Sequence, residues 1–347
     1  MAKQKLFGVD LIHAVAVTLV LAVHSFLNSG YYSEPIQGAA MTVATMVRMA
    51  CMTCTPMFML LTGYLCINRQ WSLGYYRKLL PVLITYVLVG CISLGFQIGW
   101  QGAVMSPLGF FRRLLDFSAV SYAWYIEMYI GLFLLSPFLN AAWRGLNEKA
   151  KLALVITMLV VTALPTVTNF RFQILPDWWI NLYPVTYYYL GAWLREHPIR
   201  AKGWMLVLGW LGLSALTGGL LCLFQHGQLF GGANWNARNS LLVTGEAVCL
   251  FSLLIRCEGK KLPGPVRWCI CRIGKLSLPL FMLSYITDQL LYPRLVEAVP
   301  EMTGRFVWLP VLVVIGLVAC AVMAQLVDWA TKALMRLIPQ WDKPAAQ

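Results

Sequence analysis

Long runs of apolar residues, separated by short polar segments, make up most of the sequence. About 20 apolar residues are enough for a helix to cross the hydrocarbon core of a bilayer. The pattern predicts ten such spans, over residues 8–28, 41–66, 79–98, 121–141, 150–167, 180–195, 203–224, 239–256, 272–293 and 305–337. The last run is too long for one crossing, and we expect it to continue as a surface helix.

The composition agrees with a chain embedded in lipid. Charged residues make up 12% of the 347 residues, against about 25% in an ordinary globular protein, and hydrophobic residues make up 59%. So few charges cannot cover a surface that faces water. We therefore predict an all-α polytopic transmembrane bundle of about ten spans. The sequence contains no P-loop, dinucleotide fingerprint or H-E-x-x-H motif, which argues against an ATP-driven pump, a dehydrogenase and a zinc protease.

The net charge of +13 reflects topology rather than nucleic-acid binding. The basic residues form short clusters between apolar runs, and no basic tract is interleaved with aromatics. If the N-terminus is cytoplasmic, 20 of the 27 Lys and Arg residues fall in inside segments and six fall outside. This distribution follows the positive-inside rule. We predict a multi-pass protein of the plasma membrane with both termini in the cytoplasm.

The ten cysteines do not predict a metal centre or disulfides. None lies in a predicted outside loop, where a disulfide would form and persist. Cys51 and Cys54 form a C-x-x-C motif on an apolar helix, but no second pair of ligands accompanies them. We interpret these cysteines as packing residues and expect no metal.

Ionisable residues inside a membrane are costly, and they are functional candidates by default. The first predicted span contains Asp10, His13 and His24. Eleven residues of helix make about three turns, so the two histidines lie on one face, about 16.5 Å apart along the axis. Asp10 precedes His13 by one turn and can orient or charge it. Interhelical hydrogen bonding is the structural alternative for both histidines.

Other charged residues allow a structural and a functional interpretation. Glu127 in the fourth span could pair with Arg48 of the second span or with a protonated histidine, and helix packing is an equal alternative. Arg77 and Lys78 lie at the predicted inner interface, where they either anchor a helix or meet phosphate groups. We interpret the two remaining buried carboxylates, Glu246 and Asp288, as packing residues.

Six segments of the chain follow one another with a characteristic order and spacing. The first is Asp10-Leu-Ile-His13, followed after ten residues by His24; the others are residues 56–65, 76–81, 124–137, 189–195 and 274–283. Over about residues 8–290, this set resembles the acyltransferase-3 family of integral-membrane O-acyltransferases. The stretches LLTGYL and WYIEMYIGLFLLSPFLN look closest to branches that include the membrane domains of vancomycin-resistance serine racemases.

The resemblance implies roles for individual residues, and two positions depart from the family pattern. The family has an arginine where this chain has His13, and a histidine where it has Ser284. The resemblance implies that the arginine helps to hold acyl-CoA at the cytoplasmic end, and that the histidine at position 24 promotes transfer to an acceptor. A protonated His13 could bind phosphate, but without the bidentate grip of arginine.

We therefore predict a single integral-membrane acyltransferase-like domain over residues 1–347. It would move an acyl group, expected to be acetyl, from cytoplasmic acetyl-CoA or another acyl-CoA to a hydroxyl of an envelope polysaccharide, glycan or lipid-linked sugar. His24 would be the general base or a transient acyl carrier. The other candidates form the donor side or orient a partner: Asp10 and His13 with Arg77, Lys78 and Arg48 on the donor side, and Glu127 as the orienting residue.

Two other classes of protein stay open at this point. A non-catalytic, ligand-sensing membrane domain of the same fold would agree with His13 and Ser284. A secondary transporter would agree with the sparse intramembrane charges, although the sequence shows no inverted repeat. Binding of CoA distinguishes an acyltransferase from a transporter, and acyl transfer distinguishes it from a sensor.

Overall fold

The computed structural model describes residues 7–169, 172–231 and 236–338. Within these ranges the regular structure is helical, apart from two isolated β-bridges. The longer helices are α1 (Phe7–Asn28), α2 (Gly38–Cys51), α3 (Cys54–Cys66), α5 (Leu80–Gly99), α6 (Pro107–Leu115), α7 (Trp124–Arg144), α8 (Glu148–Thr162), α10 (Tyr183–Glu196), α11 (Gly203–Phe224), α12 (Leu241–Leu254), α13 (Gly264–Lys275), α14 (Ser277–Ala298) and α16 (Leu309–Leu337). The short ones are η1 (Tyr31–Ser33), α4 (Leu73–Tyr76), η2 (Arg77–Leu79), α9 (Pro165–Thr168), η3 (Ile180–Leu182) and α15 (Met302–Arg305). The predicted all-α polytopic bundle is confirmed.

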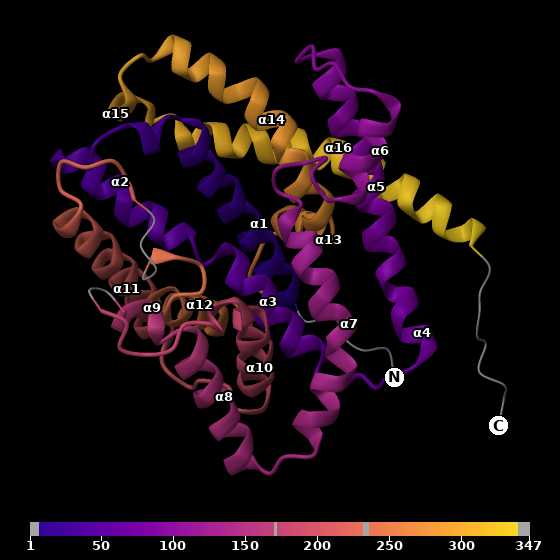
Figure 1. The fold of residues 1–347 in the computed structure, drawn as a ribbon, viewed down its shortest axis with the longest axis vertical. Coiled ribbons are helices and arrows are strands. Elements are labelled where there is room, and N and C mark those ends of the chain that lie inside the picture. The colour runs from indigo at the N-terminus through magenta and orange to yellow at the C-terminus, as the bar shows by residue number, and fades with distance from the viewer. Residues whose placement is uncertain (1–6, 170–171, 232–235, 339–347) are drawn as a thin grey trace.

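Helix α1 runs through the middle of the bundle (Figure 1), contacts α3, α13, α14 and α16, and contributes residues to two hydrophobic cores. One core joins α1 to α3, α8, α10 and α12, and the other joins it to α5, α14 and α16. Helix α7 contributes residues to both cores. Ile12, Ala16 and Val17 of α1 are fully buried between them. Because α1 is held from several sides, the polar residues that it carries have fixed positions.

Two prolines explain breaks in otherwise continuous apolar segments. Residues 41–66, which the sequence predicts as one span, form α2 and α3 with a break at Met52 and Thr53. Pro56 has no N–H group, and its ring clashes with the carbonyl four residues earlier, which is that of Met52. Pro279 likewise follows the end of α13 at Lys275 by four residues, and α14 is bent by 83° from α13.

Glycines allow close crossings between helices. A Cβ atom on Gly63 in α3 would collide with the carbonyl of Tyr188 in α10, and one on Gly191 in α10 would collide with that of Leu60 in α3. A Cβ atom on Gly274 of α13 would collide with the backbone of α1. Small residues bring membrane helices into backbone contact in this way. The three glycines belong to segments that resemble the acyltransferase pattern. In this structure they allow the helices to pack closely.

Two of the ten predicted spans correspond to helices that are shorter than the hydrocarbon core is thick. Among the described residues, seven segments are long and apolar enough to cross, and the bent pair α13–α14 makes an eighth. Helices α10 and α12 have 14 residues each, or about 21 Å, whereas the hydrocarbon core is about 30 Å thick. They coincide with the predicted spans 180–195 and 239–256. The count of ten spans and the cytoplasmic termini stay predictions.

Candidate functional site

His24 is buried near the C-terminal end of α1, with 9% of its surface exposed. Its Nδ1 atom lies 3.3 Å from Ser284 Oγ and 3.5 Å from Asp288 Oδ2, both on α14. The hydroxyl of Ser284 donates its proton to the carbonyl of Phe281, so its oxygen accepts a hydrogen bond from His24. Nδ1 therefore carries the ring proton, and Nε2 is left as the basic atom of His24.

A second set of hydrogen bonds orients Asp288. Tyr122, which precedes α7, donates its hydroxyl to Asp288 Oδ2 over 2.9 Å. Asn28 of α1 donates to the carbonyl of His24 over 2.8 Å and to the hydroxyl oxygen of Tyr122 over 3.4 Å. Asp288 is only 3% exposed, and a carboxylate this deep requires such partners. Residues from three parts of the chain thus fix the imidazole of His24.

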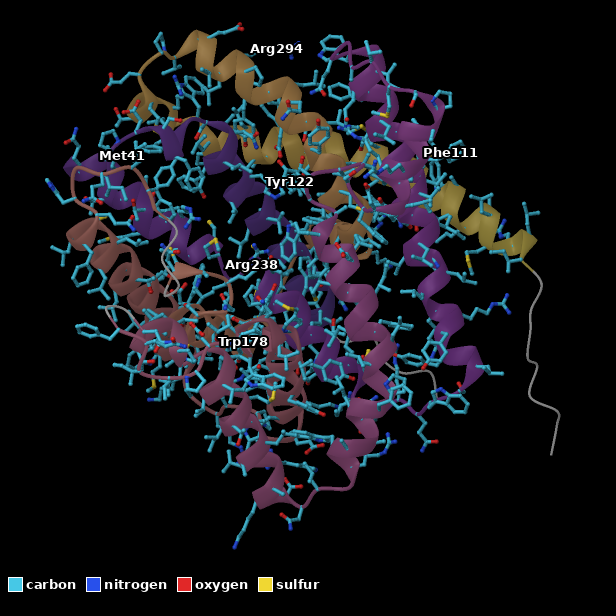
Figure 2. The ribbon with its side chains drawn as sticks, viewed as in Figure 1. Met41, Phe111, Tyr122, Trp178, Arg238 and Arg294 are labelled. Atoms are coloured by element: carbon cyan, nitrogen blue, oxygen red, sulfur yellow. The ribbon has the colours of Figure 1, made fainter. Side chains whose placement is uncertain are left out.

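Aromatic rings shield His24 from water. The ring of Tyr122 stacks on the imidazole, with centroids 3.6 Å apart and an angle of 21° between the planes. Phe281 of α14 lies 6.3 Å from both rings. Figure 2 places Tyr122 in the interior of the bundle, where α1, α7 and α14 come together. Hydrogen bonds in such a shielded site are stronger electrostatically than in water.

A cavity of about 250 Å³ lies beside this site, lined by residues of α1, α3, α5, α7 and α14. Arg69, in the loop after α3, lines it together with His13. Most of the remaining wall is apolar or aromatic and includes Tyr125 and Phe281. Phe281 also lies near the rings of His24 and Tyr122, so it links the wall of the cavity to the site.

A family model described as an acyltransferase domain matches residues 6–325. The chain belongs to this family of acyltransferases. The match includes His24, the cavity and Asp288, and it confirms the predicted acyltransferase-3 membership. It does not select a branch, so the likeness to the membrane domains of serine racemases stays a prediction. No curated protein and no solved structure matches the chain.

The sequence predicts His24 as a site residue, which stays a prediction, and it does not predict which residues surround the imidazole. We interpreted Asp288 as a packing residue and did not consider Tyr122, whereas the structure places both against His24. One signal was present: Asp288 follows Ser284 by four residues, which puts both on one face of a helix. The resemblance implies a histidine at the position of Ser284, so the sequence offers this face of α14 as a candidate.

The two other candidates of the first span lie in different surroundings. His13 lines the cavity, and its Nδ1 atom donates to the carbonyl of Val9 over 3.0 Å. Its ring lies 5.9 Å from that of Phe58 on α3. Asp10 is buried where α1 packs against α13, next to Cys271. The structure therefore places His13 in the cavity and Asp10 at a contact between helices.

The predicted donor-side cations do not line the cavity. Arg77 donates to the carbonyl of Ile338 over 3.3 Å, and Lys78 lies above the ring of Tyr75. Arg69 lines the cavity instead, although the sequence predicts it only as one of the 20 inside Lys and Arg residues. It was missed because the cavity forms from five helices that are distant in the sequence. The assignment of Arg77 and Lys78 to the donor side stays a prediction.

Arg48 and Glu127 also lie apart from the imidazole and the cavity. Arg48 donates to the hydroxyl of Tyr32 over 2.8 Å, and its guanidinium carbon lies 4.2 Å from the ring centroid of Phe230. Glu127 is exposed on α7. Of the two pairings considered for Glu127, the ion pair with Arg48 does not occur between these described residues. Their assignment to the site stays a prediction.

Proposed function

We propose that this acyltransferase moves an acetyl group from acetyl-CoA to a hydroxyl of a cell-envelope glycan. One observation carries the proposal. The imidazole of His24 is buried, and its Nδ1 atom lies against Ser284 and Asp288. Phe281 lies near this imidazole and also lines a cavity that has Arg69 in its wall. This arrangement leaves Nε2 as a base next to a space that can hold an acyl donor.

The cavity suits the slender end of acetyl-CoA. Whole ligand sites usually measure about 300–1,000 Å³, so a cavity of about 250 Å³ fits the thioester arm and leaves the nucleotide outside. Arg69 supplies a permanent positive charge for a phosphate, and a protonated His13 would add a second. A cavity of this size also favours a short acyl group.

His24 would act as a general base on the acceptor. As the acceptor oxygen attacks the thioester carbon, Nε2 of His24 takes the hydroxyl proton. The carbon–sulfur bond then breaks and an ester forms. The sulfur of CoA takes the proton from His24, and CoA leaves as a thiol. Asp288 would stabilise the imidazolium that exists between these two proton transfers, as the carboxylate of a catalytic triad does.

The two substrates would arrive from opposite ends of the bundle. Arg69 lies beyond the C-terminal end of α3, at the end of the bundle where α1 begins, and the predicted topology makes this end cytoplasmic. His24 lies toward the other end of α1, which would face the envelope. We therefore propose a plasma-membrane enzyme that receives acetyl-CoA inside and an envelope glycan outside.

Turnover of acetyl-CoA by the purified full-length protein, with a panel of envelope glycans, tests this function. His24→Ala should lower the rate by about 10²–10⁴-fold, the usual contribution of a general base, while acetyl-CoA still binds. His197→Ala, which removes a histidine that stacks on Trp193 away from the site, is the matched control and should keep the wild-type rate.

Binding of acetyl-CoA supplies a second readout of the same proposal. Arg69→Ala should weaken binding, and Arg77→Ala should not, because only Arg69 lines the cavity. Wild-type turnover in His24→Ala would contradict the proposal. Absence of acetyl-CoA binding by the wild type would also contradict it and would favour a ligand-sensing membrane domain.

A further inference from the structure

Arg305 is the last residue of the short helix α15, and it is buried although its side chain carries a permanent positive charge. Only 7% of its surface is exposed. Its Nε atom donates to the carbonyl of Val299 over 2.7 Å, Nη1 donates to that of Ser29 over 2.7 Å, and Nη2 donates to that of Pro300 over 2.6 Å. One guanidinium group thus binds three backbone carbonyls, and charge-assisted hydrogen bonds of this length are strong.

The three carbonyls lie at the C-terminal ends of two helices. Ser29 directly follows α1, Val299 is the C-cap of α14, and Pro300 comes next in the chain. The last carbonyls of a helix have no partner within that helix, and they form the negative end of its dipole. A buried cation is therefore stabilised where two such ends meet. Figure 1 shows α15 beside the C-terminal end of α1, in agreement with the hydrogen bond from Arg305 to Ser29.

Gly30 makes room for the guanidinium group. Its φ is +85°, in the left-handed region that favours glycine. A Cβ atom on Gly30 would lie 2.9 Å from Nη1 of Arg305. The turn that follows α1 therefore leaves the space that this side chain occupies, so the contact belongs to the design of the turn.

Helices α1 and α14 also carry the candidate site. His24 lies five residues before Ser29, which is about 7.5 Å along the axis of α1. Ser284 and Asp288, which lie against Nδ1 of His24, belong to α14. Hydrogen bonds weaken steeply when their geometry is distorted. A shift of one helix relative to the other would therefore loosen the contacts of Nδ1, and Arg305 joins the ends of these two helices.

We infer that Arg305 is a positioning residue, which joins the C-terminal ends of α1 and α14 and so holds the imidazole of His24 against Asp288. The inference rests on the proposed function, in which His24 is the general base, and it adds a residue that acts through the backbone. Arg305 does not line the donor cavity, so its replacement should alter the use of His24 but not the binding of acetyl-CoA. Lysine cannot replace it, because an ammonium group is a point charge rather than a planar fork of donors.

Nitrogen NMR of the full-length protein with isotope-labelled histidine tests this inference without acyl transfer. The chain has four histidines, and His24→Ala identifies the signals of His24. In the wild type, His24 should give one species with its proton on Nδ1, the atom that faces Ser284 and Asp288. Arg305→Lys and Arg305→Gln should each lower the share of this species by about twofold or more, because the ring then exchanges between tautomers.

Turnover of acetyl-CoA supplies a second readout. Both variants of Arg305 should lower kcat by about 10- to 100-fold, the cost of misplacing a catalytic group by about 1 Å, and KM for acetyl-CoA should stay constant. Arg294→Lys is the matched control, because Arg294 is an exposed arginine on α14 (Figure 2). It should keep the spectrum and the kcat of the wild type.

An unchanged spectrum of His24 in a folded variant of Arg305 would overturn the inference, and a lower unfolding midpoint alone would make the role of Arg305 purely structural. An equal change of the spectrum in Arg294→Lys would also overturn it. Thermal unfolding shows which variants fold, and failure of both Arg305 variants to fold would equally count against a positioning role. A changed spectrum in a protein without His24-dependent turnover would contradict the proposed function and leave the positioning of His24 by Arg305 intact.

Discussion

At the scale of the residue, the chemistry of the site depends on which nitrogen of His24 is free. Ser284 can only accept from His24, because its own proton goes to a backbone carbonyl. Asp288 approaches the same nitrogen, and Tyr122 holds that carboxylate in place. Ser284 and Asp288, one turn apart on α14, thus both face Nδ1 of His24.

The role of Asp288 is open to a direct test. Asp288→Asn keeps the shape of the side chain but removes the charge that stabilises an imidazolium. Loss of a hydrogen bond to a charged group costs about 1.5–3 kcal/mol, so kcat should fall by roughly 10- to 100-fold. KM for acetyl-CoA should stay constant, because Asp288 does not line the donor cavity.

Glu246→Gln provides the matched control for Asp288→Asn. Glu246 is equally buried, but it accepts hydrogen bonds from Ser214 and Thr217 of α11, outside the site. Its loss should leave kcat close to that of the wild type. An unchanged kcat in Asp288→Asn, or an equal fall of kcat in both variants, would show that Asp288 has no positioning role.

At the scale of the element, glycine contacts fix the helices that surround the cavity. Helix α3 supplies part of the cavity wall, and its position depends on the crossing with α10 at Gly63 and Gly191. The break before α3 depends on Pro56. Helix α1 is similarly fixed against α13 by Gly274. These backbone positions determine where the walls of the cavity stand.

Gly63→Ala should destabilise the fold, because a methyl group there meets the backbone of α10 rather than a side chain that can move. Overpacking of this kind typically costs about 1–3 kcal/mol. The thermal unfolding midpoint of the purified protein measures the effect. Gly131→Ala on α7 is the matched control, since nothing lies within 4 Å of its added Cβ atom, and its midpoint should not fall. A midpoint for Gly63→Ala equal to that of the control would contradict the packing argument.

At the scale of the whole molecule, the sequence predicts helices well and contacts between helices poorly. Apolar runs locate most of the longer helices, because only a helix satisfies its backbone hydrogen bonds in lipid. They do not locate α6 or most of α13, which are more polar. The sequence predicts His24 as a candidate because the polar residues of one helix form a local pattern. Its partner Ser284 lies 260 residues away, and no local pattern encodes that contact. Arg69 was missed for the same reason, since five helices must assemble before the cavity exists.

The proposed function assigns the two substrates to different parts of α1. The cavity that His13 and Arg69 line lies beside α1, and His24 lies near the C-terminal end of this helix. On this account the acetyl group would pass along α1, from a donor in the cavity to an acceptor that reaches His24 from the opposite side of the membrane.

Transfer across a sealed membrane tests this central claim most directly. Proteoliposomes would receive labelled acetyl-CoA on the outside only, with the glycan acceptor that supports turnover enclosed inside. The account predicts that labelled, esterified glycan accumulates inside the wild-type vesicles and that it is absent from vesicles that contain His24→Ala. The account would be contradicted if esterified glycan formed only when donor and acceptor share one compartment. It would also be contradicted if wild type and His24→Ala gave equal amounts of product.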